Sequence, residues 1–121
     1  MNPDEAVLVV DDDDDVRDTL QMLLEADGHF ALSASSAEEA MSMIEAHQPI
    51  CVILDLNMPE VGGAQLAKRI RSIHGTGVVL IVLTGSTDES DQDAAERAGV
   101  DYVLHKPLNV AHLRDLLPRV C

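Results

Sequence analysis

Short apolar runs alternate with longer segments of helical period along the whole chain. The runs are mainly aliphatic, and three of them are rich in the β-branched residues typical of strands that are buried on both faces. They cover residues 6–10, 30–34, 51–54, 78–83 and 102–104. This pattern predicts five short strands.

The segments between these runs place apolar side chains three or four residues apart, which is the period of a helix with one buried face. The fourth segment, residues 88–98, has only alanines to bury, so we expect a short and loosely held helix there. The five predicted stripes are Val16, Leu20, Leu23 and Leu24; Ala37, Ala40, Met41 and Ile44; Leu66, Ile70 and Ile73; Ala94, Ala95 and Ala98; and Val110, Leu113, Leu116, Leu117 and Val120.

Five strand and helix units predict one mostly parallel sheet with helices on both faces. In sheets of this kind, ligands bind beyond the carboxyl ends of the strands, where the order of the strands reverses. The residues that directly follow each predicted strand are therefore the candidates for function.

The length of 121 residues fits one domain, and we expect a single domain over residues 1–121. The chain carries 22 Asp and Glu against 8 Lys and Arg, a formal net charge of −14, yet 46% of its residues are apolar, which favours a folded core. Such a charge should repel nucleic acids and anionic membranes. The acidic first residues and the lack of an apolar run of about 20 residues lead us to expect a cytoplasmic protein.

Polar residues stand at the ends of four predicted strands. Residues 11–15 are all Asp and follow the first strand, Asp55 follows the third, Thr84 the fourth and Lys106 the fifth. Carboxylates that converge within about 4 to 6 Å repel one another by a few kcal/mol per pair, so a cation should lie among them. A hard divalent ion such as Mg²⁺ would relieve that repulsion. Such a site suits phosphoryl transfer, in which a carboxylate can serve as the nucleophile.

The chain resembles the receiver domain of two-component response regulators in four motifs, which are Val9–Asp12, Leu54–Pro59, Leu83–Gly85 and His105–Leu108. The match extends over the whole chain, in the order and at the spacing of that family. The resemblance implies a flavodoxin-like α/β fold, in which a doubly wound, five-stranded parallel sheet of (βα)5 units forms the middle of three α/β/α layers.

The resemblance also implies a role for each residue at the strand ends. Asp55 is expected to accept the phosphoryl group, Thr84 to move its hydroxyl toward the phosphoryl oxygens, and Lys106 to supply the cation of the family. Gly63 is expected in a tight turn that opens the third helix. The implied Mg²⁺ ligands are Asp11, Asp12, Asp55 and, through its backbone carbonyl, Asn57.

One position departs from the family pattern. The family usually carries an aromatic residue three positions before the lysine, where this chain has Val103. Tyr102 lies one residue earlier, and an offset of one residue in a strand points a side chain to the opposite face. We therefore expect Tyr102 to face away from the side on which the aromatic residue of the family lies.

The function implied by the resemblance is a phosphorylation switch. A histidine kinase or phosphotransfer protein would phosphorylate Asp55 in the presence of Mg²⁺, and the chain would catalyse its own phosphorylation and dephosphorylation. The surface of the fourth helix, fifth strand and fifth helix would then change its affinity for a downstream protein. The chain ends just after the fifth predicted helix, so we expect no output domain.

Two alternatives remain open from the residues. A phosphohydrolase of the haloacid dehalogenase type also uses an Asp nucleophile after a strand, here Asp11 with Asp13, although no further Gly-Asp motif follows Lys106. A receiver-like module could also bind its partners without phosphorylation.

Residues 13–15 are interpreted as the cap and first turn of the first helix.

Overall fold

Five parallel strands form one sheet in the order β2-β1-β3-β4-β5. The computed structural model describes residues 6–56, 62–75, 77–85, 89–105, 111, 113 and 115, apart from the side chain of residue 91. Each strand boundary lies within one residue of the prediction. The strands are β1 (Val7–Val10), β2 (Ala31–Ala34), β3 (Cys51–Asp55), β4 (Val79–Thr84) and β5 (Tyr102–His105).

The helices follow the predicted stripes. They are α1 (Asp14–Ala26), α2 (Ala37–His47), α3 (Gly63–His74) and α4 (Glu89–Arg97). The carboxylate of Asp13 caps α1, because it accepts hydrogen bonds from the backbone N–H groups of Asp15 and Val16 at 2.9 and 3.3 Å. The fifth predicted helix lies largely outside the described residues, of which positions 111, 113 and 115 are helical.

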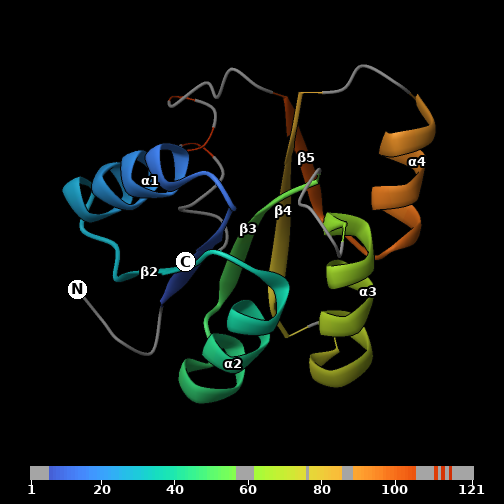
Figure 1. Ribbon diagram of the computed structural model, residues 1–121, viewed down its shortest axis with the longest axis horizontal. Helices are drawn as coiled ribbons and strands as arrows, with labels where there is room; N and C mark the ends of the chain where they lie inside the picture. Colours follow the sequence, from blue (N-terminus) through green and yellow to red (C-terminus); the bar gives the residue numbers. More distant parts are fainter. Residues whose placement is uncertain are drawn as a thin grey trace.

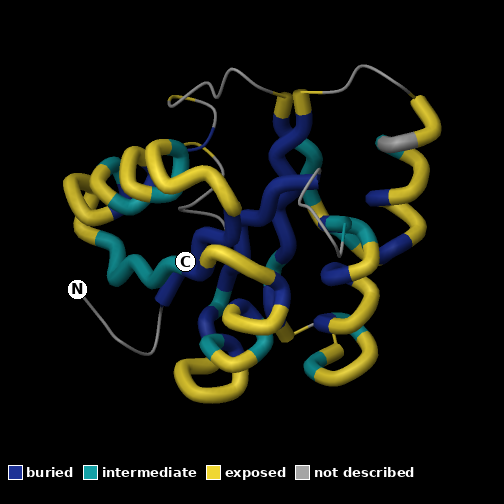
Figure 2. Tube along the Cα trace, viewed as in Figure 1, coloured by how far each residue is buried: buried dark blue, intermediate teal, exposed yellow. Residues whose placement is uncertain are grey.

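The sheet separates two apolar clusters, as Figure 1 shows for the helices on either side of it. One cluster joins alternate strand residues such as Leu8, Val52 and Leu80 to α2, α3 and α4. The other joins residues such as Val9 and Ile53 to α1 and to position 113. Because both faces are covered, the central strands are buried along their whole length, in agreement with the apolar runs (Figure 2).

Two residues predicted for the core lie on the surface instead. Ile73 is 64% exposed, because it falls in the last turn of α3 at the edge of a buried stripe formed by Leu66, Ala67 and Ile70. Ala94 is exposed, and only its neighbour Ala95 and the later Ala98 face the sheet. For α1 to α4 the stripes therefore predicted the helices correctly, but they overstated the width of the buried faces of α3 and α4.

The strand order reverses between β1 and β3. The chain leaves β1 toward β2 on one side and returns to β3 on the other, so the crevice for a ligand lies at the carboxyl ends of β1 and β3. Within the described residues, no helix is long and apolar enough to cross a membrane.

Candidate functional site

Three aspartates meet at the point where the strand order reverses. Asp11 directly follows β1, Asp12 is the next residue of the loop, and Asp55 ends β3. One carboxylate oxygen of each residue lies within 4.8 Å of the other two. Asp11 and Asp55 are buried, at 2% and 6% exposure, whereas Asp12 is exposed. The cluster therefore extends from the interior of the sheet to solvent.

The loop after β1 and the first turns of α1 together hold Asp11 in place. The backbone N–H of Asp13 donates to Oδ1 of Asp11 at 2.9 Å, and Nη1 of Arg17 donates to the Asp11 carbonyl oxygen at 2.8 Å. The same guanidinium forms an ion pair with Asp14. Arg17 thus fixes the loop that carries two of the three acids, a role that the sequence analysis did not identify.

Gly63 brings the start of α3 against the end of β3. Its backbone N–H donates to the carbonyl oxygen of Leu56 at 2.9 Å. A Cβ atom at this position would overlap the carbonyl oxygen of Asp55 and would lie 2.7 Å from Cα of Leu56. Only glycine fits this approach without a backbone shift. Gly63 is the first residue of α3, as expected, whereas the residues before Gly62 that would form the predicted turn lie outside the described part of the chain.

Thr84 and Gly85 stand beside the cluster at the end of β4. Thr84 is fully buried, and the register pairs the preceding Leu83 with Asp55 on β3. A Cβ atom added to Gly85 would have no heavy atom within 4 Å. The neighbouring position on β5 in register with Thr84 is His105. The rim of the sheet at which β1, β3 and β4 end thus carries the acidic pair Asp11 and Asp12, the third acid Asp55 and the hydroxyl of Thr84.

The residues of the cluster suit a hard divalent cation. Two unit charges 4.8 Å apart repel by about 3 kcal/mol at an effective dielectric constant of about 20. All three side chains offer carboxylate oxygens, which are the ligands that Mg²⁺ and Ca²⁺ prefer. The other two residues expected here, Asn57 and Lys106, lie outside the described residues.

The face assignment at β5 is as predicted. Val103 packs against the apolar cluster beneath α2, α3 and α4. Tyr102 packs against the other apolar cluster, on the side of α1. The chain's only tyrosine therefore lies on the other side of the sheet from the position of the aromatic residue in the family.

Comparisons with known proteins agree with this geometry. Residues 7–118 match the model of the response regulator receiver domain. The chain is 38% identical to a 14.6 kDa protein of Leptolyngbya boryana from the sodA1 3′ region, over 95% of this chain and 88% of that protein. It is 35% identical to the response regulator MprA of Mycolicibacterium vanbaalenii, over 93% of this chain and 50% of MprA.

Comparison with solved structures indicates the same family. A response regulator receiver protein from Pseudomonas putida superimposes with a TM-score of 0.89 at 31% identity, over 95% of this chain and 96% of that one. The chain therefore belongs to the receiver domain family of two-component response regulators. It spans about half the length of MprA. The predicted family and fold class are both confirmed.

Proposed function

We propose that this receiver domain is a phosphorylation switch in which Asp55 accepts a phosphoryl group from a histidine kinase or phosphotransfer protein. The supporting observation is the convergence of Asp11, Asp12 and Asp55 within 4.8 Å at the rim of the sheet. A divalent cation would offset the repulsion among three converging carboxylates, and phosphoryl transfer uses such a cation to neutralise charge on the phosphoryl oxygens.

In this proposal each residue has a distinct task. Asp11, Asp12 and Asp55 would bind Mg²⁺, together with the backbone carbonyl of Asn57. The second carboxylate oxygen of Asp55 would attack phosphorus, forming an O–P bond while the P–N bond of the donor histidine breaks and its electron pair leaves with the imidazole nitrogen. Lys106 would supply a second cation. Bound Mg²⁺ would neutralise charge on the transferring phosphoryl group.

Thr84 would change its side-chain position in response to phosphorylation of Asp55. Its side chain is buried beside the acceptor strand, so a hydroxyl that turns toward the phosphoryl oxygens would change the packing at the end of β4. Phosphorylation adds a group of about −1.5 to −2 charges at neutral pH. The surface of α4, β5 and the fifth predicted helix would then differ in its affinity for a downstream protein.

Three further statements stay predictions, on the partner, the location and the domain organisation. The net charge of −14 supports a protein partner and opposes direct binding to nucleic acid or an anionic membrane by this chain. A cytoplasmic location is part of the same proposal, as is the organisation of residues 1–121 as a single receiver domain.

The alternative phosphohydrolase gains no support from the site. That enzyme class would need Asp13 beside Asp11 as part of the reaction centre. The carboxylate of Asp13 instead accepts hydrogen bonds from two backbone N–H groups at the start of α1. We therefore retain Asp55 as the nucleophile.

The test is phosphorylation by acetyl phosphate with Mg²⁺, followed by intact mass measurement. Wild type should gain one phosphoryl group, and Asp55→Asn should gain none. The matched control is Asp18→Asn, which neutralises an exposed acid on α1 and should behave as wild type. A gain that persists in Asp55→Asn and disappears in Asp11→Asn would favour the phosphohydrolase. No gain in wild type would favour a module that acts without phosphorylation.

A further inference from the structure

Thr84 and His105 end neighbouring strands on the same face of the sheet. The register pairs Thr84 with His105 and Val82 with Val103. Both valines belong to the cluster beneath α2, α3 and α4, and residues two apart in a strand point to the same face. Neighbouring strands lie about 4.8 Å apart. The exposed ring of His105 therefore stands beside buried Thr84, on the face that α4 covers.

Helix α4 is fastened mainly near its C-terminal end. Its described buried side chain is Ala95, and Ala98 follows just after the helix. Beyond them, Nε of Arg71 donates to the carbonyl oxygen of Gly99 at 2.8 Å. Figure 2 shows buried residues at this end of α4 and exposed ones toward its start. Two methyl groups bury far less apolar area than the leucines and isoleucines of α1 and α3. The N-terminal half of α4 is therefore held more weakly.

A polar contact connects that weaker half to β5. Nε2 of Gln92 lies 3.4 Å from Nε2 of His105. The amide N–H of Gln92 donates to this nitrogen in the His105 tautomer that carries its proton on Nδ1. The contact joins the first half of α4 to the residue of β5 that is in register with Thr84.

We propose that His105 and Gln92 form the link through which the state of the phosphorylation site reaches α4. The inference rests on the proposed function, because it takes Thr84 to respond to phosphorylation of Asp55. A change in the Thr84 side chain alters the space beside the His105 ring, and the position of the ring decides whether Gln92 reaches it. A single exposed hydrogen bond shifts such an equilibrium roughly 2- to 10-fold, so the link biases α4 rather than locking it.

Backbone amide hydrogen exchange of residues 93–97 tests the link in the unphosphorylated protein. These amides have acceptors within α4, so their exchange reports opening of the helix. We expect exchange roughly 2- to 10-fold faster in His105→Ala and in Gln92→Ala, with no further increase in the double variant. His105→Gln, whose amide oxygen can still accept, should partly restore protection.

The matched control is Gln65→Ala, which removes an exposed glutamine from the neighbouring helix α3. Backbone amides 93–97 of this variant should exchange at the wild-type rate. Equal exchange in wild type and both single variants would overturn the link. Additive effects in the double variant would overturn it as well, because the two side chains would then act separately.

A second measurement addresses signalling. Each protein is treated with acetyl phosphate and Mg²⁺, and intact mass gives the phosphorylated fraction. At equal fractions, phosphorylation should change α4 exchange in wild type at least 2-fold more than in His105→Ala or Gln92→Ala. An identical change in all proteins would overturn the link while leaving phosphorylation of Asp55 intact. No mass gain in wild type would instead remove the proposed function, and with it the signal assigned to the link.

Discussion

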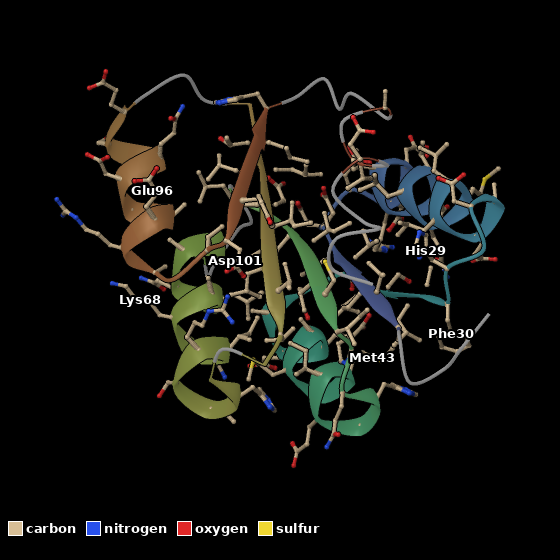
Figure 3. All side chains as sticks on the ribbon, turned by 180° about the vertical axis from the view of Figure 1, so that it is seen from behind. His29, Phe30, Met43, Lys68, Glu96 and Asp101 are labelled. Carbon is tan, nitrogen blue, oxygen red and sulfur yellow. The ribbon has the colours of Figure 1, made fainter. Side chains whose placement is uncertain are left out.

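Charged side chains are arranged in opposite ways at the two ends of the sheet. At the carboxyl end, Asp11, Asp12 and Asp55 bring three like charges within 4.8 Å. At the amino end, an ion pair joins Arg71 of α3 to Asp101, which directly precedes β5, at 2.6 Å. Figure 3 shows Asp101 beside α3, far from the loop that carries the acidic cluster.

The ion pair at the amino end is part of a larger network. Arg71 also donates to the carbonyl oxygens of Gly75, Val78 and Gly99, and the Asp101 carboxylate accepts from the backbone N–H of Leu80 at 2.9 Å. The network thus ties the end of α3 to the strands β4 and β5 and to the end of α4. Opposite charges are paired at this end, whereas three like charges converge at the other end, which costs the fold stability.

The largest expected effect concerns the junction that shapes the carboxyl end. Gly63→Ala should lower the free energy of unfolding by about 3 kcal/mol, because the new Cβ overlaps backbone atoms of Asp55 and Leu56, which cannot rotate away. Urea denaturation measures the loss. Gly77→Ala is the control, since its Cβ would have ordinary contacts and should cost less than 1 kcal/mol by comparison. Equal losses would show that the close approach is not a constraint.

The second largest loss of stability is expected for a substitution at the amino end of the sheet. Arg71→Met keeps much of the side-chain length but removes the guanidinium donor from several carbonyl oxygens and from the Asp101 carboxylate, which keeps the N–H of Leu80. We expect a loss of about 2 kcal/mol in unfolding free energy. Arg69→Met, at an exposed position of the same helix, is the matched control and should lose less than about 0.5 kcal/mol. A loss for Arg71→Met no larger than that of the control would remove the contrast between the two ends.

The smallest effect is a gain rather than a loss. In metal-free buffer, Asp12→Asn should raise the unfolding free energy by up to about 1 kcal/mol, because it removes one of three repelling charges at a solvent-exposed position. With saturating Mg²⁺ the sign should reverse, since the variant has lost a ligand. Denaturation with EDTA and with Mg²⁺, beside Asp18→Asn, measures both. A destabilised variant in EDTA would mean that the three acids do not oppose the fold.

Local sequence predicted the strands and the position of the site well. Parallel strands end at the same rim of a sheet, so residues such as Asp11 and Asp55 meet whatever the details of packing. Gly63 was predicted by resemblance, and its reason, the close approach of α3 to β3, became visible only in the structure.

The contacts made across the fold were not predictable in this way. Arg71 and Asp101 are 30 residues apart, and neither has a neighbour in sequence that suggests the pairing. Arg17 follows a run of acids in the sequence, and nothing in that stretch indicates that its guanidinium reaches back to the Asp11 carbonyl. Such contacts depend on how helices pack on the sheet, which the period of apolar residues does not specify.

The placement of Tyr102 has a practical consequence for optical spectroscopy. The chain has one tyrosine and no tryptophan, so its intrinsic ultraviolet fluorescence comes from a single phenol at the start of β5. That fluorophore lies about 10 Å along the strand from His105, and it packs on the α1 side. Its emission therefore reports first on the amino end of the sheet, and a measurement at the carboxyl end, where Asp55 lies, needs an introduced dye or isotope label.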